Sequence, residues 1–269
     1  DSSVLDQVRS GRKNIIINGA MSICQRFAVN TANNISNATH TYHVDRFKAY
    51  ESTDAILQGV WLNSGPPGFY NSLQYTPATA DTTLANEQFG FISQVIELNH
   101  IRHLEYGNSD AVTCTLSFYV RSNVTGTYCI ALLNDGTNNR GFVTEYTIDS
   151  ANTWERKVIT IPGDTSGTWS SNGLRIAWTL VSSGNRHTTT VGSWFTDSTV
   201  RYATNKQVNF MSSTSNDFRI TGVQFEVGNY ATDFEHRCYA EELSLCQRYY
   251  QKIEGYSDLV MFGSGRANG

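Results

Sequence analysis

The stretch that decides the fold is Phe218–Lys252, which reads FRITGVQFEVGNYATDFEHRCYAEELSLCQRYYQK. It opens with an alternating run rich in aromatic and β-branched residues, which predicts a strand. The pair Gly228-Asn229 then ends the run as a turn. Strict alternation assigns two faces to this strand: Phe218, Ile220 and Gly222 on one, and Arg219, Thr221, Val223, Phe225 and Val227 on the other.

The second half of the stretch, Tyr239–Lys252, has the spacing of a helix. Leu243, Cys246 and Tyr250 recur at helical intervals and would form one apolar stripe. Two acidic residues occupy the first turn, where negative charge suits the helix dipole. A last strand that feeds a closing helix is a natural end for a sandwich domain.

Upstream segments alternate as strands too. In Ala111–Arg121 every second residue is apolar, as in a strand with one buried face. Two shorter runs, Asn14–Ile17 and Met21–Phe27, are predicted to be short strands on either side of the turn pair Asn18-Gly19. Phe89–Leu98 has two apolar faces: Phe89, Phe91 and Val95 on one, and Ile92 and Ile96 on the other.

The whole pattern favours one all-β architecture. Roughly ten to twelve strands are separated by turn signals, with a single helix near the end, which is typical of an all-β sandwich. No internal repeat is visible, and no domain linker precedes Arg237.

Three blocks of the sequence resemble a known family. The first is NIIINGAMSICQRF at 14–27, followed by YHVDRF at 42–47. The second is TWERKVITIPGDTSGTW at 153–169, and the third is ITGVQFEVGNYATDFEHRCYAEELSLCQRYYQK at 220–252. They closely resemble the carbohydrate-binding-module-like domain found in bacteriophage tail-fibre and other virion proteins. The resemblance covers residues from about 12 to 252 and implies a jelly-roll β-sandwich. Asp233 stands where the family usually has Pro, which loosens that turn.

The expected organisation has three parts. Residues 1–13 form an arm or the end of an upstream segment, 14–238 the sandwich, and 239–269 the helix and the start of a following β-element. The family commonly has a second small β-domain at that point. The chain begins at Asp1 without Met and ends at Gly269, so we expect it to be part of a longer polypeptide.

Composition limits the classes of partner. The net charge is −4 and the pI about 5.9, with no basic run, which argues against nucleic acid. No apolar run is long enough for a membrane span. Five cysteines occur without metal-ligand spacing. Free thiols fit assembly in the reducing bacterial cytoplasm, which the resemblance to phage proteins implies.

Catalytic signatures are missing from the sequence. The 24 acidic residues include no recognisable glycosidase pair, and no nucleophile elbow, phosphate loop or zinc motif occurs. His100 and His103 lie between Glu97 and Glu105 and could be imagined as metal ligands, but a polar turn is favoured because no third ligand follows at a known spacing. We therefore expect a protein that is not an enzyme and needs no cofactor, although a structural Ca²⁺ held by loop carbonyls stays possible.

Sugar binding calls for other residues: aromatic rings to stack on sugar faces, and polar side chains to bind hydroxyls. Loops carry most binding residues on β scaffolds, so the candidates are Trp169, Trp194, Arg186, Tyr70 and Tyr75. The alternative for each Trp is core packing or a hydrophobic lid. That alternative is favoured outright for Trp154 and Trp178.

Two functions compete. The first is a non-catalytic virion fibre component, on tail or head, that binds host-surface carbohydrate. The second is a purely structural fibre, decoration or trimerisation module. Other fibre or capsid subunits are expected as partners, and the family analogy favours a homotrimer, although no heptad pattern supports it.

Overall fold

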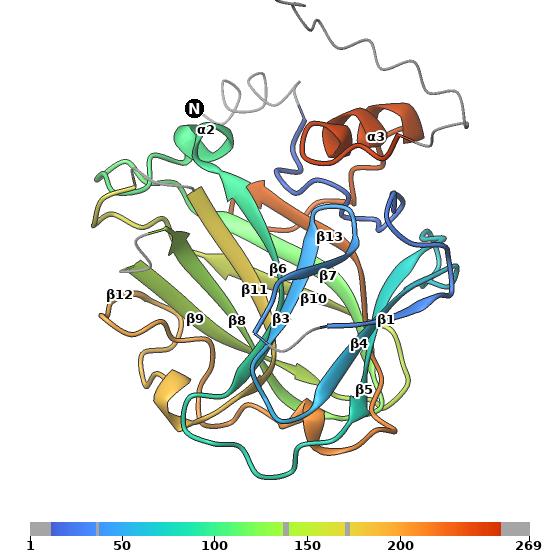
Figure 1. Ribbon diagram of the computed structural model, residues 1–269. Coiled ribbons are helices and arrows are strands. Elements are labelled where there is room, and N and C mark those ends of the chain that lie inside the picture. Colours follow the sequence, from blue (N-terminus) through green and yellow to red (C-terminus); the bar gives the residue numbers. More distant parts are fainter. Residues whose placement is uncertain (1–11, 36–37, 137–139, 170–172, 254–269) are drawn as a thin grey trace, which may run out of the picture.

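The computed structural model describes residues 12–35, 38–136, 140–169 and 173–253 (Figure 1). Most of the expected N-terminal arm, and the expected β-element after the helix, lie outside these residues. The described chain forms two antiparallel sheets that pack face to face.

The first sheet has six strands, in the order β1 (Ala32–Asn34), β4 (Ile56–Leu62), β5 (Ser72–Thr79), β13 (Phe218–Val227), β7 (Cys114–Ser122) and β10 (Glu155–Ile161). The second has seven, in the order β12 (Trp194–Thr196), β9 (Arg140–Ile148), β8 (Gly126–Asp135), β11 (Gly173–Ser182), β6 (Phe89–Glu97), β3 (Phe47–Glu51) and β2 (Thr41–Val44). The helices are short: α2 (Leu98–Ile101), α3 (Tyr239–Gln247) and the 3₁₀ turns Arg102–Leu104, Gly184–Arg186 and Phe210–Ser212.

The order of the strands makes this a jelly roll. The chain passes from β5 to β6, β7 and β8 by changing sheet each time, turns into β9, and then changes sheet again through β10, β11 and β13. The result is β5-β13-β7-β10 against β9-β8-β11-β6, two interleaved Greek keys. The prediction of an all-β jelly-roll sandwich with a short C-terminal helix is confirmed.

The core lies between the sheets and is rich in aromatic side chains. Trp178 of β11 is fully buried, as predicted, with Phe47 of β3 and Phe118 of β7 beside it at ring distances of 6.2 and 5.9 Å. Ile92 and Ile96 of β6 face this core, whereas Phe91 belongs to a separate cluster on the outer side of the seven-stranded sheet. The two apolar faces read from Phe89–Leu98 are therefore confirmed.

Strand β13 corrects the prediction of strict alternation. Its pairing with β7 shifts register between Thr221 and Gln224, which is a β-bulge. Gly222 sits at the bulge with φ +61°, a left-handed conformation that glycine adopts at little cost. The bulge turns Val223 and Phe225 to the same core face as the start of the strand.

The N-terminal block forms no strand, so the two short strands predicted in Asn14–Phe27 are wrong. Buried side chains hold this segment instead. Gln94 of β6 accepts a hydrogen bond from the backbone N–H of Ile17 (2.9 Å) and donates one to its carbonyl (2.8 Å). Asn14 donates to the carbonyl of Val223 and accepts from the N–H of Phe225. These amides take the place of strand partners, because buried backbone groups must be bonded.

Helix α3 packs on this N-terminal segment. It begins at Tyr239, as predicted, but ends at Gln247. Cys246 forms a small apolar cluster with Ile17 and Ile23. The carboxylate of Glu242 accepts a hydrogen bond from the N–H of Asn18 (2.6 Å). The helix thus joins the two ends of the described chain at one end of the sandwich (Figure 1).

Candidate functional site

The structure brings two of the predicted residues together. Trp169 lies in the loop before β11 and Trp194 begins β12, and their rings meet edge to face at 5.7 Å. Tyr106 completes the group, at 5.1 Å from Trp169 and 5.6 Å from Trp194. Both tryptophans are half-buried and pack against the core. They close one end of the sandwich and keep part of each ring at the surface.

A buried ion pair fixes this tryptophan group. Asp164 is 1% exposed, and its carboxylate accepts hydrogen bonds from Nε and Nη2 of the Arg140 guanidinium. The Trp169 indole N–H donates to the same carboxylate (3.0 Å), and the Trp194 N–H donates to the carbonyl of Pro162 (2.7 Å). With both N–H groups bonded within the protein, the tryptophans offer a ligand ring surface but no donor.

The remaining predicted residues lie apart from the tryptophans. Arg186 follows the end of β11, whereas Trp169 precedes its start, so they lie at opposite ends of that strand. Tyr70 is 74% exposed and lines a cavity of about 220 Å³ beside Phe69 and Phe234.

Tyr75 needs a correction. The side chain lies on the inner face of β5, is fully buried, and its hydroxyl lies 3.2 Å from Nδ1 of His43. Burial raises the pKa of the hydroxyl. The ring of Tyr75 therefore cannot contact a ligand in this structure.

A second group of rings covers part of the outer face of the seven-stranded sheet. We call Tyr50, Phe89, Phe91 and Tyr202 the aromatic column. Neighbouring rings are nearly parallel, at interplanar angles between 13° and 24° and centroid distances between 4.7 and 5.9 Å. Phe91 and Tyr202 are buried, whereas Tyr50 and Phe89 are only half-buried. Part of each of these last two side chains is therefore exposed, and the ring of His40 lies 5.0 Å from that of Tyr50.

Charged side chains border the aromatic column. The Arg186 guanidinium lies 4.9 Å from the centre of the Phe89 ring, within the range of a cation–π contact, and pairs with Glu87 (2.9 Å). Lys48 of β3 lies opposite Ser93 of β6, and Arg175 of β11 pairs with Asp135. The column is thus flanked by hydrogen-bonding groups.

The cations affect the neighbouring ionisable groups. Partial burial, with the positive charges of Lys48 and Arg175, lowers the pKa of His40 to about 4, so its ring is neutral at pH 7. Burial and the Arg175 charge likewise lower the pKa of Lys48.

Several polar atoms on this face are buried without a hydrogen-bond partner among the described residues. They are Ser93 Oγ, Ser182 Oγ and the Nε atoms of Arg46, Arg175 and Arg186. Buried polar atoms normally have partners, so each such atom calls for an explanation. A ligand would meet the half-buried guanidinium groups of Arg175 and Arg186, which lie over the rings of Phe91 and Phe89, rather than these buried atoms.

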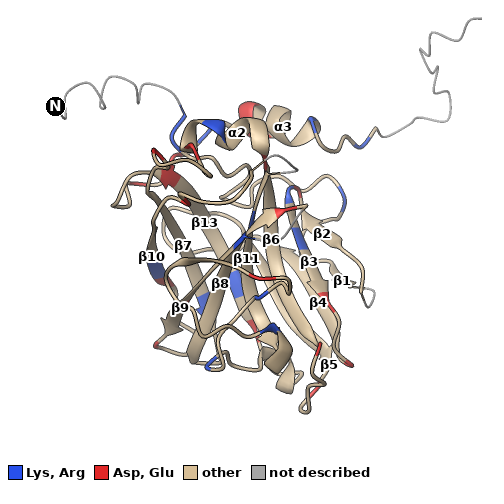
Figure 2. Cartoon of the chain, turned by 90° about the vertical axis from the view of Figure 1, so that its left-hand side faces the viewer, with Lys and Arg blue, Asp and Glu red and all other residues tan. Residues whose placement is uncertain are grey.

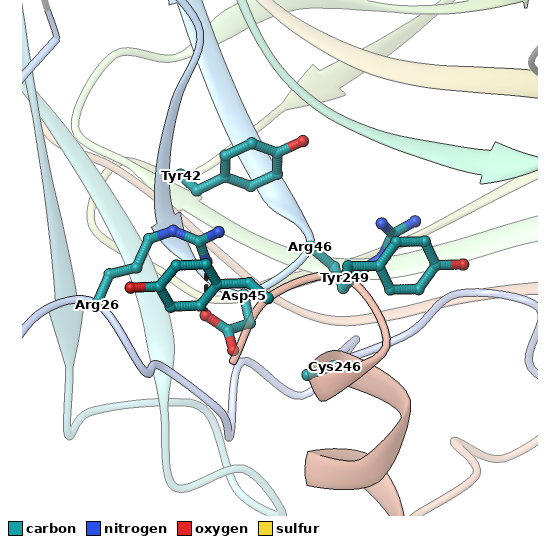
Figure 3. Close-up of a pocket in the computed structure, with 7 residues that line it drawn as sticks. Arg26, Tyr42, Asp45, Arg46, Cys246 and Tyr249 are labelled. Carbon is teal, nitrogen blue, oxygen red and sulfur yellow. Dashed lines mark hydrogen bonds and ion pairs between the residues drawn. The ribbon is translucent and has the colours of Figure 1, made fainter. Parts of the chain in front are cut away.

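A cavity opens where this face meets α3. It has a volume of about 150 Å³ and contains two arginines, each stacked on a tyrosine (Figure 3). Arg46 lies 3.4 Å from the ring centre of Tyr249, and Arg26 lies 3.5 Å from that of Tyr250. Asp45 pairs with Arg26 (2.9 Å). The full lining is Arg26, Tyr42, Asp45, Arg46, Cys246, Tyr249 and Tyr250.

The segment with His100 and His103 forms α2 and the 3₁₀ turn after it, a short helical connection between strands. Within the described residues, no three His, Cys, Asp or Glu side chains gather as a metal ion would require. None of the described helices is long and apolar enough to cross a membrane.

Sequence reasoning missed the aromatic column because it searched loops. Tyr50, Phe89 and Phe91 come from strands β3 and β6, and only Tyr202 comes from a loop. One signal was available, since Phe89 and Phe91 already formed the second apolar face of their strand. An aromatic face that points away from the core marks a surface cluster.

Comparisons with known proteins add similarities of fold. No family model and no curated protein sequence matches the chain. A solved structure of the enzymatically active domain of bacteriophage CBA120 tailspike protein 4 is similar over 72% of this chain, with 14% identity and a TM-score of 0.40. The arabinose-bound α-L-arabinofuranosidase MgGH51 is similar over 81%, with 11% identity and a TM-score of 0.42. This chain spans only 21% and 27% of those two chains.

A carbohydrate-binding module is similar over almost its whole length. The family 11 carbohydrate-binding module of the Clostridium thermocellum cellulase Lic26A-Cel5E is similar over 74% of this chain and 99% of its own, with 16% identity and a TM-score of 0.36. At these identities the likeness concerns the fold alone.

Proposed function

We propose that this protein is a non-catalytic carbohydrate-binding module of a bacteriophage virion fibre and that it binds host-surface glycan. The binding surface is the outer face of the seven-stranded sheet. One observation carries the proposal: the half-exposed rings of Tyr50 and Phe89 belong to an aromatic column that is bordered by the half-buried guanidiniums of Arg175 and Arg186.

The chemistry of sugars matches this surface. A pyranose ring has an apolar face of C–H groups, which packs on a flat aromatic side chain, and a rim of hydroxyls, which needs donors and acceptors. Tyr50 and Phe89 supply the aromatic surface, and the half-buried side chains of Arg175 and Arg186 supply hydrogen-bonding groups. Binding sites of this kind combine apolar area with a few placed polar groups.

The assignment to a virion rests on the sequence blocks that resemble phage fibre proteins. A phage fibre meets its host through surface polysaccharide, so a sugar-binding sandwich on a fibre would serve attachment. The location is the tail or head fibre, after assembly in the host cytoplasm.

A binding assay on a glycan array and on whole host cells tests the proposal. The test variant is Tyr50→Leu with Phe89→Leu, which keeps apolar volume but removes both half-exposed flat rings. Tyr70→Leu is the matched control, because Tyr70 is the most exposed large hydrophobic side chain among the described residues and is not part of the column. We expect saturable binding by the wild type and the control, with affinity lowered at least about tenfold in a test variant that stays folded.

Two other outcomes are informative. Binding that survives this change but is lost in Trp169→Ala with Trp194→Ala would move the site to the tryptophan group. Absence of binding by well-folded wild type would contradict the proposal and favour the structural alternative.

That alternative, a spacer or trimerisation module, has one observation in its favour. Large side chains are exposed at the end of the sandwich where α3 lies, including Tyr239 at 66% and Ile253 at 71%. Exposed apolar surface of this kind can mark contacts between subunits. We propose a homotrimer, and sedimentation of a stable monomer in analytical ultracentrifugation would count against it.

A further inference from the structure

We propose that the glycan bound at this face is acidic and that Arg46 and Lys48 pair with its negative groups. The proposal rests on the function proposed above and names its class of ligand. The relevant chemistry is a carboxylate or sulfate carried on a sugar.

The observation behind it is a local excess of positive charge. Five basic side chains lie on the outer face of the seven-stranded sheet or where it borders α3. They are Arg26, Arg46, Lys48, Arg175 and Arg248. Three carboxylates neutralise three of them, through the pairs Arg26–Asp45, Arg175–Asp135 and Arg248–Glu97. Neither Arg46 nor Lys48 has an ion-pair partner among the described residues. Two cations without an ion pair of their own therefore lie two residues apart in a chain whose net charge is −4.

The backbone register keeps these cations together. Lys48 pairs across with Ser93 on β6, and Arg175, on the other side of β6, pairs with Val95. Arg46 immediately precedes β3 and donates to the carbonyl of Val95 (2.5 Å). Figure 2 shows basic positions on β3 and on β11, the two strands that flank β6.

Both unpaired cations are partly removed from water. Arg46 lies against Tyr249 at one wall of the 150 Å³ cavity, and its Nε has no acceptor among the described residues. Burial lowers the pKa of Arg46 and of Lys48 from their usual values. Holding like charges near one another with little water is unfavourable unless something compensates them. An anion bound between them would relieve this repulsion.

The size and position of the charge favour an acidic sugar. Two free cations would match one or two anionic groups, whereas a nucleic acid needs a longer basic surface. The cations also lie next to the aromatic column, because Lys48 and Tyr50 are alternate residues on the outer side of β3. One ligand could thus stack on Tyr50 and place an acidic group near Lys48.

The experiment compares charged glycans with their uncharged parents. The probes are oligogalacturonate beside its carboxyl-reduced form, and sulfated galactan oligosaccharide beside the desulfated form, measured by calorimetry at two salt concentrations. We expect one acidic probe to bind at least about tenfold more tightly than its parent, with affinity falling as salt rises. The probe that binds distinguishes carboxylate from sulfate.

Two charge-removing variants locate the contact. Lys48→Gln should weaken binding of the acidic probe about tenfold, because it removes a charge-assisted hydrogen bond. Arg156→Gln is the matched control: it also removes one positive charge, but from exposed β10 of the other sheet, and should leave binding unchanged.

The outcomes distinguish failure of this inference from failure of the proposed carbohydrate-binding function. Equal binding of acidic and neutral probes, with Lys48→Gln unaffected, would overturn the inference and leave carbohydrate binding standing. If no glycan binds the folded wild type on the array either, the proposed function fails and the inference fails with it.

Discussion

His43 shows how one buried side chain makes stability depend on pH. The ring is 1% exposed, with Nε2 at 2.9 Å from the carbonyl of Asn33 and Nδ1 at 3.2 Å from the hydroxyl of Tyr75. A neutral ring with its proton on Nε2 satisfies both contacts, since it donates to the carbonyl and accepts from the hydroxyl. Burial lowers the pKa of His43 to about 4.

This low pKa predicts acid sensitivity. The unfolded chain binds the proton near pH 6.5 and the folded chain only near pH 4, so the stability that His43 contributes is present above about pH 6.5 and is lost as the pH falls toward 4. We expect this residue to account for about 3 kcal/mol of the decrease in unfolding free energy. Urea unfolding at about pH 7 and about pH 4 should show a smaller decrease in His43→Gln than in the wild type.

His100→Gln is the matched control for this comparison. It removes a histidine from α2, away from His43, and should keep the wild-type pH dependence. A decrease of the same size in His43→Gln and in the wild type would show that another group causes the acid sensitivity.

At the scale of elements, the bulge in β13 decides which side chains enter the core. Because Gly222 has φ +61°, any other residue there is strained, and an added Cβ would lie 2.7 Å from the Phe69 ring and 2.9 Å from the Tyr119 ring. We expect Gly222→Ala to lower the unfolding free energy by about 2 to 3 kcal/mol, measured by urea unfolding. Gly184→Ala, at a glycine with open space around it, should change it by less than about 1 kcal/mol. Equal effects of the two changes would refute this role of the bulge.

The same strand shows what the sequence could predict. The alternating pattern predicted β13 and both of its ends correctly. An aromatic and β-branched run that ends in Gly-Asn is a signal within the segment itself. The pattern assigned Val223 and Phe225 to the wrong face, because the bulge depends on pairing with β7, a strand about a hundred residues upstream. The prediction of two strands in Asn14–Phe27 was wrong for a similar reason. The backbone of Ile17 bonds to the side chain of Gln94, which belongs to β6, far away in the sequence.

The candidate site was predictable to a similar degree. Their loop positions made Trp169 and Trp194 candidates for sugar binding, and the structure brings their rings together. Tyr75 was misjudged because its burial follows from its place on the inner face of β5, which the sequence alone does not show. The pairing of β3 with β6 creates the aromatic column, and that pairing is a property of the fold.

At the scale of the whole molecule, the two ends of the described chain depend on one another. Arg237 connects them: its side chain is 4% exposed and donates to the carbonyls of Ile16 (3.0 Å) and Asn14. The same guanidinium pairs with Glu235 (3.1 Å) and Glu242 (3.3 Å). One side chain thus holds the N-terminal segment, the connection after β13 and helix α3.

This arrangement predicts that the N-terminal segment and helix α3 unfold locally together. Arg237→Leu removes the cation that pairs with both carboxylates and the donor to two carbonyls, so we expect a loss of about 3 to 5 kcal/mol in unfolding free energy. Limited proteolysis of the variant should cut within residues 14–27 and within 238–252 at similar rates, because each segment holds the other in place. Arg248→Leu breaks an ion pair with Glu97 whose Arg side chain is 55% exposed, and should cost less than about 1 kcal/mol. Cleavage confined to the C-terminal segment would show that the N-terminal segment is held by Gln94 and Asn14 without help from α3.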